Sequence, residues 1–222
     1  MIGAGSPPRV ALIHALGHSI APITAAFERE WPAAMRMNLL DDSLSADLAR
    51  NPAGLDMRMT GRFMALAAYA LEAGAQGILF TCSAFGPCIE AVKRRWPDVP
   101  VLKPNEAMID DAVRIGPRIG LVASFAATLA SMPAEFPPDV AITTAHAQGA
   151  LEALDAGDVE AHDALAAAAA QRIASACDVV VLAQFSLARA LPAVERVVQV
   201  PVLTTPVSAV RALRSRMGFA AA

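Results

Sequence analysis

An apolar run ends abruptly at small polar residues in the stretch Gly77-Ile78-Leu79-Phe80-Thr81-Cys82-Ser83-Ala84-Phe85-Gly86-Pro87. Its first residues favour a buried strand. A helical pattern begins after Gly86-Pro87, where a proline suits the first turn of a helix. The stretch therefore predicts a strand, a tight turn and a helix. This order places Cys82 at the carboxyl end of a strand, where open α/β sheets bind their ligands.

Cys82 has two interpretations at this position. Backbone N–H groups that follow a strand end, near the positive end of a helix, can hold an anion and can lower the pKa of a thiol. A lone cysteine is more often a small buried apolar residue. Only the rest of the chain can separate a reactive thiol from a core residue here.

The composition predicts a compact protein that acts on a small molecule. The chain has 222 residues, of which 55% are hydrophobic, with a mean hydropathy of +0.45 and a formal net charge of −3. This length allows one large domain or two small ones. We expect no membrane span and, without a large Lys/Arg cluster, no nucleic-acid partner. Three cysteines without metal-type spacing, and no secretory signal, favour the reducing cytoplasm.

Strands and helices alternate along the whole chain. The pattern predicts strands at 9–16, 35–40, 77–80, 99–102, 118–125, 140–144, 177–183 and 200–204. It predicts helices at 20–31, 60–73, 87–96, 106–115, 126–131 and 158–176, with a last helix after Pro206. This alternation indicates an α/β fold with mainly parallel sheets and right-handed crossovers.

The second half of the chain repeats the first. The strand at 118–125 resembles the one at 9–16, residues 177–186 align without gaps on 75–84, and 200–206 echo 99–104. The alignment puts Gln184 where the first half has Cys82. We therefore expect two pseudo-symmetric lobes, each a mainly parallel four-stranded sheet flanked by helices, with an active-site cleft between them. The N-terminal lobe would hold 1–104 plus 206–222, and the C-terminal lobe 105–205.

The same residues resemble the aspartate/glutamate/hydantoin racemase superfamily, which includes arylmalonate decarboxylases and maleate isomerases. The resemblance covers nearly the whole chain. It rests on these segments: Phe80-Thr81-Cys82-Ser83, Gly120-Leu121-Val122-Ala123-Ser124 with Thr128, Val181-Leu182-Ala183-Gln184, and Pro201-Val202-Leu203-Thr204-Thr205-Pro206. It implies an isomerase that needs no cofactor. In such a site one thiolate removes the proton next to a carboxylate, and a second thiol returns a proton from the opposite face.

The chain departs from this racemase pattern in its second half. Gln184 stands where a racemase has its second cysteine, and an amide does not titrate usefully. Cys177 lies seven residues earlier, at the far end of the strand, and Cys88 belongs to the helix after Cys82. Arylmalonate decarboxylases also keep one catalytic cysteine, but in the second half. Two-base racemisation is therefore in doubt.

Small polar residues after the strand ends are the candidates for binding a carboxylate. We expect Ser83 and Ala84, and the N–H groups from Ser124 to Thr128, to bind it, with Thr81 beside them. Each hydroxyl could instead cap its own helix, the role that we prefer for Ser19. Paired carboxylates at Asp41-Asp42 favour a loop or a helix cap.

The remaining candidates keep open alternatives. His14 and His18 lie near the first strand end, where either a ligand contact or a structural role is possible. Ser186 could bind a ligand or relay a proton through water, although it is a poor base without a partner. Phe185, like Phe85 and Phe125, fits an apolar part of a substrate or the core. His146 has no evident partner, and we expect His162 on a solvated helix face.

Taken together, these residues predict an enzyme that transfers a proton at the carbon next to a carboxylate of a small acid or amino-acid derivative. Cys82 would be the base, with Gln184 donating a hydrogen bond to the opposite face of the substrate and Ser186 nearby. One alternative is a decarboxylase or cis–trans isomerase that uses the single cysteine. Another is a non-catalytic binding or sensor protein for small acids. We expect no metal, no cofactor and a homo-oligomer.

Overall fold

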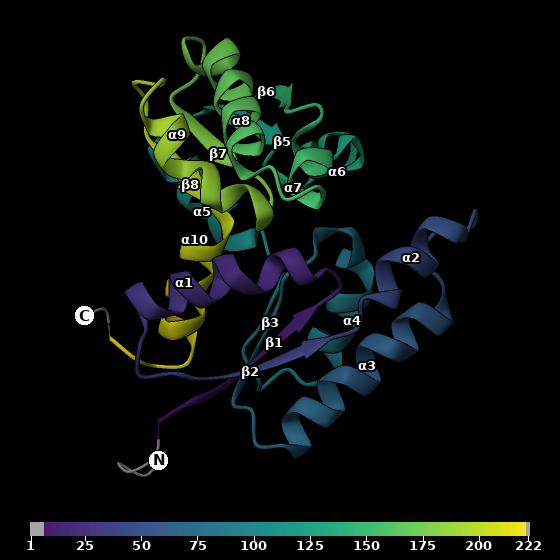
Figure 1. Ribbon diagram of the computed structural model, residues 1–222. Helices are drawn as coiled ribbons and strands as arrows, with labels where there is room; N and C mark the ends of the chain where they lie inside the picture. Colours follow the sequence, from purple (N-terminus) through teal and green to yellow (C-terminus); the bar gives the residue numbers. More distant parts are fainter. Residues whose placement is uncertain (1–6, 221–222) are drawn as a thin grey trace. The chain divides into compact units, whose positions relative to one another are not determined.

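The computed structural model describes residues 7–220, which form two compact units (Figure 1). The N-terminal unit ends at Pro104 and resumes at Ala209, and the C-terminal unit is Asn105–Ser208. The sequence had placed the return at residue 206. The chain re-enters the N-terminal unit inside its last helix, α10 (Thr205–Arg216).

The N-terminal unit is built on a four-stranded parallel sheet. Its strands are β1 (Arg9–His14), β2 (Met35–Leu40), β3 (Gly77–Phe80) and β4 (Val101–Leu102), in the spatial order β2-β1-β3-β4. The helices are α1 (Ile20–Glu30), α2 (Ser43–Arg50), α3 (Met57–Glu72) and α4 (Gly86–Arg95), with short 3₁₀ turns η1 (Gly17–Ser19) and η2 (Ser83–Phe85). All strand pairs run parallel, so the carboxyl ends of the strands share one edge.

The C-terminal unit repeats this arrangement. Its strands β5 (Arg118–Ala123), β6 (Ala141–His146), β7 (Val179–Leu182) and β8 (Val202–Thr204) pair in parallel in the order β6-β5-β7-β8. The helices are α5 (Glu106–Ile115), α6 (Ala126–Ser131), α7 (Ala150–Asp155), α8 (Val159–Ala174) and α9 (Leu191–Glu195), with 3₁₀ turns η3 (Met132–Glu135) and η4 (Ser186–Ala190). Two four-stranded parallel sheets flanked by helices confirm the predicted fold class.

Alternating apolar residues of the central strands supply the core on both faces of each sheet. In the N-terminal unit, Ala11 and Ile13 of β1 pack with Phe63 of α3 and Ile89 of α4. The opposite face is covered by α10, where Leu213 and Met217 approach Gly77. In the C-terminal unit, α8 and α9 pack on one face of the sheet and α5 and η3 on the other. Burial on both faces explains why β3 and β7 are continuously apolar.

The registers of the two sheets match. Ile13 pairs with Phe80 at the end of β3, and Val122 pairs with Leu182 at the end of β7. Cys82 is the second residue after β3, and Gln184 is the second residue after β7. The internal alignment made from the sequence therefore places these two side chains at corresponding positions of their own sheets.

Several local predictions were wrong. Helices α2, α7 and α9 were missed because each is short, with eight, six and five residues respectively. Helix α3 begins at Met57 rather than at 60, because Asp56 accepts a hydrogen bond from the Met59 N–H at 2.8 Å and caps the helix. Strand β4 is two residues long. The expected solvated His162 is fully buried. Ser19 occupies the N-cap position of α1, but its side chain makes no capping hydrogen bond.

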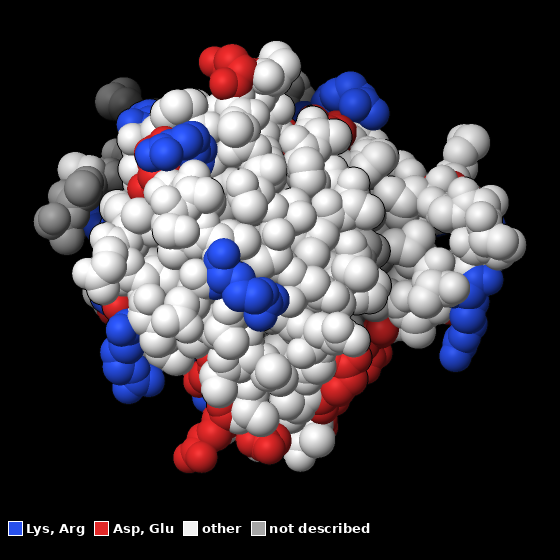
Figure 2. All heavy atoms as spheres, turned by 90° about the horizontal axis from the view of Figure 1, so that it is seen from above, with Lys and Arg blue, Asp and Glu red and all other residues white. Residues whose placement is uncertain are grey.

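The surface charges and the lengths of the helices supply two further observations. On the face drawn in Figure 2, uncharged residues predominate and the Lys and Arg side chains are scattered rather than gathered. Among the described residues, none of the helices is both long and apolar enough to cross a membrane.

Candidate functional site

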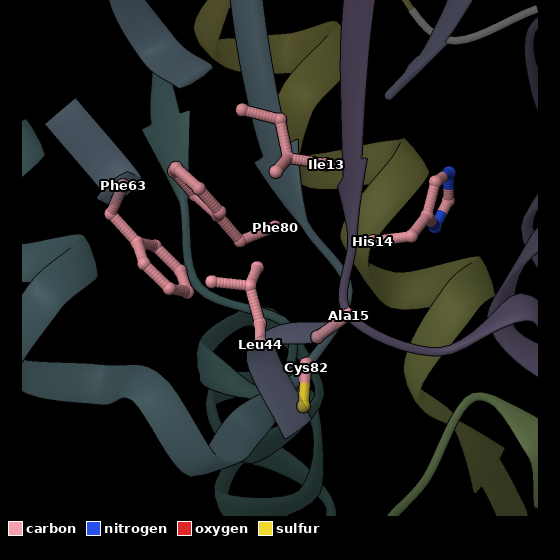
Figure 3. Close-up of a pocket in the computed structure, with 7 residues that line it drawn as sticks. All are labelled: Ile13, His14, Ala15, Leu44, Phe63, Phe80 and Cys82. Carbon is pink, nitrogen blue, oxygen red and sulfur yellow. The ribbon is translucent and has the colours of Figure 1, made fainter. Parts of the chain in front are cut away.

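Cys82 lies where β3 gives way to the turn η2, at the carboxyl edge of the N-terminal sheet (Figure 3). It borders a hollow whose other lining residues come from β1, α2, α3 and β3: Ile13, His14, Ala15, Leu44, Phe63 and Phe80. The space among these side chains is too small to admit even a water molecule. The hollow is therefore an apolar wall beside the thiol rather than a complete substrate site.

Two hydrogen-bond donors approach the Cys82 sulfur. They are the backbone N–H of Ala84 and the hydroxyl of Ser45, and both favour the thiolate. Burial opposes them and has the larger effect, so the pKa of the Cys82 thiol is raised above its ordinary value. A helix field can lower the pKa of such a thiol, but here desolvation outweighs the donors. At neutral pH the resting side chain is a thiol.

Ser45 was not among the residues predicted from the sequence. It lies in the first turn of α2, next to Leu44, and its hydroxyl donates to the Ala15 carbonyl oxygen at 3.1 Å. The available signal was Asp41-Asp42-Ser43, a cluster of capping residues ahead of apolar residues at helical spacing. Recognising α2 there would have brought Ser45 to the edge of the sheet.

A charged cluster ties α2 to α3. Arg62 of α3 contacts Asp41 at 2.5 Å and Asp47 at 2.6 Å, while the Ser43 hydroxyl donates to Asp41 at 2.6 Å. Burial opposes the charged form of Asp41, but hydrogen bonds from Ser43 and the charge of Arg62 together outweigh it, so the pKa of Asp41 is lowered. Asp41, in the loop after β2, therefore helps to hold the start of α2 in place, whereas Asp42 occupies the N-cap position without a side-chain capping hydrogen bond.

His14 lies on the other side of β1 from Phe80 and Leu44, as Figure 3 shows. Its ring is fully buried, with Nδ1 2.9 Å from the Thr81 hydroxyl and Nε2 3.0 Å from the Asn38 amide oxygen. A neutral ring satisfies both contacts when Thr81 donates to Nδ1 and Nε2–H donates to Asn38. Burial lowers the pKa of His14, which favours that neutral ring. These contacts join three strands, so His14 and Thr81 support the sheet edge.

The two residues after Cys82 differ in exposure. Ser83 is partly exposed and Ala84 is exposed, both within η2. The Ala84 N–H already approaches the Cys82 sulfur, so it acts on the thiol before any ligand arrives. Phe85 is fully buried and packs on Phe63 with ring centroids 4.9 Å apart, which makes it a core residue.

At the corresponding edge of the C-terminal sheet, Gln184 bonds to Ser124. The Gln184 amide oxygen accepts hydrogen bonds from the Ser124 N–H at 2.6 Å and from the Ser124 hydroxyl at 3.0 Å. Both donors that we had expected to hold a substrate carboxylate are therefore occupied by a side chain of the same unit.

The neighbours of Gln184 are arranged around this bond. His146, at the end of β6, lies with Nε2 3.3 Å from the Ser124 carbonyl oxygen, a contact that the sequence did not reveal. Thr128 is buried, and its N–H donates to the Phe125 carbonyl oxygen at 3.0 Å. Phe185 is buried, whereas Ser186 is partly exposed at the start of η4.

The other two cysteines lie in the core. Cys88 is fully buried in α4, and Cys177 is buried with its thiol donating to the Ile173 carbonyl oxygen. All three cysteines are free. Within residues 7–220, no group of three or more His, Cys, Asp or Glu side chains is arranged to hold a metal ion.

Comparisons with solved structures agree on the fold. An aspartate racemase homologue from Pyrococcus horikoshii OT3 has a TM-score of 0.71 at 15% identity, covering 94% of this chain and 98% of the other. Glutamate racemase from Francisella tularensis subsp. tularensis SCHU S4, in complex with D-glutamate, has a TM-score of 0.68 at 14% identity, covering 94% and 80%. Arylmalonate decarboxylase has a TM-score of 0.66 at 18% identity, covering 95% and 93%.

The family follows from the sequence itself. No curated protein matches the chain in sequence. The family described as Asp/Glu/Hydantoin racemase does match, over residues 20–213, a range that includes Cys82 and Gln184. This match spans most of the chain, and the chain belongs to the Asp/Glu/hydantoin racemase family.

Proposed function

We propose that this protein is a cofactor-independent enzyme that transfers a proton at the carbon next to a carboxylate of a small acid, with Cys82 as the single acid/base group. One observation carries the proposal. Cys82 is a thiol at the carboxyl edge of a sheet with two donors directed at its sulfur, whereas Gln184 fills the corresponding position of the other sheet.

The chemistry suits a thiol that can ionise. The thiolate takes the proton from carbon, the C–H electron pair moves into an ene-diolate, and the proton ends on sulfur. The reverse transfer regenerates the acid and the thiolate. Because the resting pKa is raised, only a small fraction is thiolate at neutral pH, and the rate of proton removal should rise with pH.

The single thiol also predicts the stereochemical outcome. A group on one side of the substrate returns the proton, or a deuteron from solvent, to the face from which it came. Gln184 does not titrate, and its oxygen is committed to Ser124. We therefore expect exchange with retention of configuration rather than racemisation.

Decarboxylation is the second candidate, and the raised pKa of Cys82 favours it. Loss of CO2 from a carbon that bears two carboxylates leaves a carbanion, which needs a proton donor. A thiol that is protonated at neutral pH supplies that proton and recovers it from water. This reaction requires no initial thiolate, so its rate should fall as pH rises through the thiol pKa.

The proposal also includes the cellular compartment, the class of substrate and the oligomeric state. Three free cysteines support a reducing cytoplasm, and we expect a small carboxylic acid as substrate and a homo-oligomeric enzyme.

The test is proton NMR in D2O with aspartate, glutamate, a substituted hydantoin, an arylmalonate and maleate. We expect α-proton exchange or loss of CO2 with one of these acids, abolished in Cys82→Ala and retained in Cys177→Ala, a control from the core of the other unit. Turnover that survives in folded Cys82→Ala would refute the proposal. Ligand-induced stabilisation without turnover of any of these acids would favour the binding or sensor alternative.

A further inference from the structure

Helix α2 closes one side of the hollow beside Cys82 with a single side chain. Of the eight residues of α2 only Leu44 is buried, and it lines the hollow together with Phe63, Phe80 and Cys82 (Figure 3). Because the hollow is too small to admit a water molecule, a lining residue has to move before anything can enter it. Leu44 is the lining residue that comes from an element otherwise at the surface. The hollow can therefore open if α2 moves away.

The sequence of α2 does little to hold the helix in place. An isolated helix shorter than about 12 residues is marginally stable in water. Asp42, at the N-cap position, makes no side-chain capping hydrogen bond. Leu48 is only partly buried, and the Ser45 hydroxyl donates one hydrogen bond to the Ala15 carbonyl oxygen at 3.1 Å. The position of α2 therefore depends on contacts that come from other elements.

The side chain of Arg62, on α3, supplies such contacts. Its Nη1 contacts the Asp47 carboxylate of α2 at 2.6 Å, and its Nη2 donates to the Asp41 carboxylate and to the Ser43 hydroxyl. Asp41 is itself held at the end of β1, because its N–H donates to the His14 carbonyl oxygen at 3.0 Å. Arg62 therefore joins α2 to the edge of the sheet.

The base of this clasp is firm, but the clasp itself is exposed. Four apolar side chains are buried along one face of α3: Met59, Phe63, Ala67 and Ala70. The side chains of the clasp are 32% exposed for Arg62, 27% for Asp41 and 48% for Asp47. Ion pairs this exposed are individually weak and are weakened further by salt. The clasp can therefore favour one position of α2 without locking the helix there.

We infer that α2 is a lid over one side of the Cys82 thiol and that Arg62 is the positioning residue that holds the lid closed. In the open state Leu44 leaves the hollow, and small molecules reach the thiol from that side. The step makes and breaks no covalent bond. It concerns access to Cys82, so only its meaning for turnover rests on the proposed function.

Hydrogen exchange of the folded protein, followed by mass spectrometry, measures the opening of α2 directly. In Arg62→Ala we expect the amides of α2 to exchange about fivefold faster, because two exposed ion pairs are lost. The amides of α4, in the core of the same unit, should keep their wild-type rate. Arg62→Lys keeps a cation that can bind one carboxylate at a time, so its rate should lie between the two.

Alkylation of Cys82 by a neutral maleimide shows whether α2 covers the thiol. Cys82 is partly exposed and α2 shields one side of it, so we expect labelling at least about twofold faster in Arg62→Ala. Losing a nearby cation would by itself raise the pKa of a thiol and slow its alkylation. An acceleration therefore reports opening. Raising NaCl from about 0.1 M to about 1 M should accelerate labelling of the wild type but not of Arg62→Ala.

Arg58→Ala is the matched control. It removes an exposed cation from the same helix, with the same change of charge. We expect wild-type exchange in α2 and wild-type alkylation of Cys82. Unchanged exchange in α2 or unchanged alkylation in Arg62→Ala would overturn the inference, as would an equal effect of Arg58→Ala. An equal rise of exchange in α4 would also overturn it, because the whole unit would then have loosened.

The outcome is independent of the test of function, since neither measurement needs a substrate. Faster α2 exchange and Cys82 labelling in Arg62→Ala, combined with full turnover in folded Cys82→Ala, would keep the lid and reject the proposed function. Unchanged exchange and labelling, combined with loss of turnover in Cys82→Ala, would do the reverse.

Discussion

The carboxyl edges of the two sheets share a strand order and a register but differ in their chemistry. After β1 and β3 of the N-terminal unit, a thiol is approached by an N–H and a hydroxyl. After β5 and β7 of the C-terminal unit, an amide oxygen takes both donors of Ser124. The donors at the N-terminal edge are therefore directed at a group that can become negatively charged. The donors at the C-terminal edge are already bonded to Gln184.

A second difference lies at the last residue of the first strand of each unit. His14 ends β1 with a buried polar network, while the corresponding end of β5 is Ala123, which is fully buried and apolar. The N-terminal edge thus carries titratable groups that the C-terminal edge lacks at matching positions. The same backbone arrangement supports an ionisable site in one unit and a closed hydrogen-bonded one in the other.

The largest effect, a loss of turnover, is expected when Cys82 is replaced by the residue found at the corresponding position of the C-terminal unit. Replacing Cys82→Gln copies the C-terminal side chain and removes the acid/base group, so turnover should fall by about 10²–10⁴-fold, the usual contribution of such a group. Cys82→Ser tests the same loss with a smaller side chain, and circular dichroism checks the fold. Turnover within tenfold of wild type in either folded variant would contradict the difference that we draw between the edges.

Replacing His14→Ala makes the N-terminal edge resemble Ala123. The buried Thr81 hydroxyl would lose a partner, at a cost of about 1–3 kcal/mol, whereas the exposed Asn38 amide can bond to water instead. Urea unfolding followed by circular dichroism measures this loss. His18→Ala, at an exposed position nearby, should change the free energy of unfolding by less than about 0.5 kcal/mol. Equal effects of the two substitutions would argue against a supporting network around His14.

Opening the C-terminal edge should cost less. Gln184→Ala leaves the Ser124 N–H and hydroxyl without their acceptor, and we expect a loss of about 1–3 kcal/mol, reduced where water enters. A small carboxylate such as malonate should then raise the melting temperature of Gln184→Ala more than that of the wild type. Equal shifts in both proteins would mean that Gln184 does not occupy an anion site.

The smallest expected effect is the contribution of His14 to the pH dependence of the free energy of unfolding. Burial lowers its pKa in the folded protein, so the unfolded chain binds more protons between the folded pKa and about 6.5. Stability from this group is complete above about pH 6.5 and is lost as pH falls toward the folded pKa, by at most about 1.4 kcal/mol per pH unit. The slope of unfolding free energy against pH should flatten in His14→Ala. A slope unchanged by that substitution would exclude His14 as its source.

The sequence was sufficient for the features that depend on continuous apolar patterns. The strands β3 and β7, the helix α5 and the correspondence between Cys82 and Gln184 could all be read from residues that are buried in regular order. Helix α2 was missed although capping residues precede it, because it is short and the Arg62 contacts that hold it come from the separate segment α3.

The site was less accessible from sequence than the fold. Ser45 and Asn38 reach the strand ends from segments distant in the chain, so their partners emerge only in three dimensions. The direction of the Cys82 pKa depended on the balance between burial and two donors, a balance that local sequence does not specify. For the same reason His162, which has charged neighbours in sequence, was placed on the surface although its ring is buried.

The central claim is that the Cys82 proton is the one that moves during turnover. The most direct test compares two pH profiles of the wild-type protein, the rate of α-proton exchange in D2O and the rate of Cys82 alkylation in the same solvent. The account predicts that both rise with pH and share one midpoint above the ordinary value for a cysteine. An exchange rate that does not follow Cys82 ionisation, with a midpoint different from that of alkylation, would contradict it.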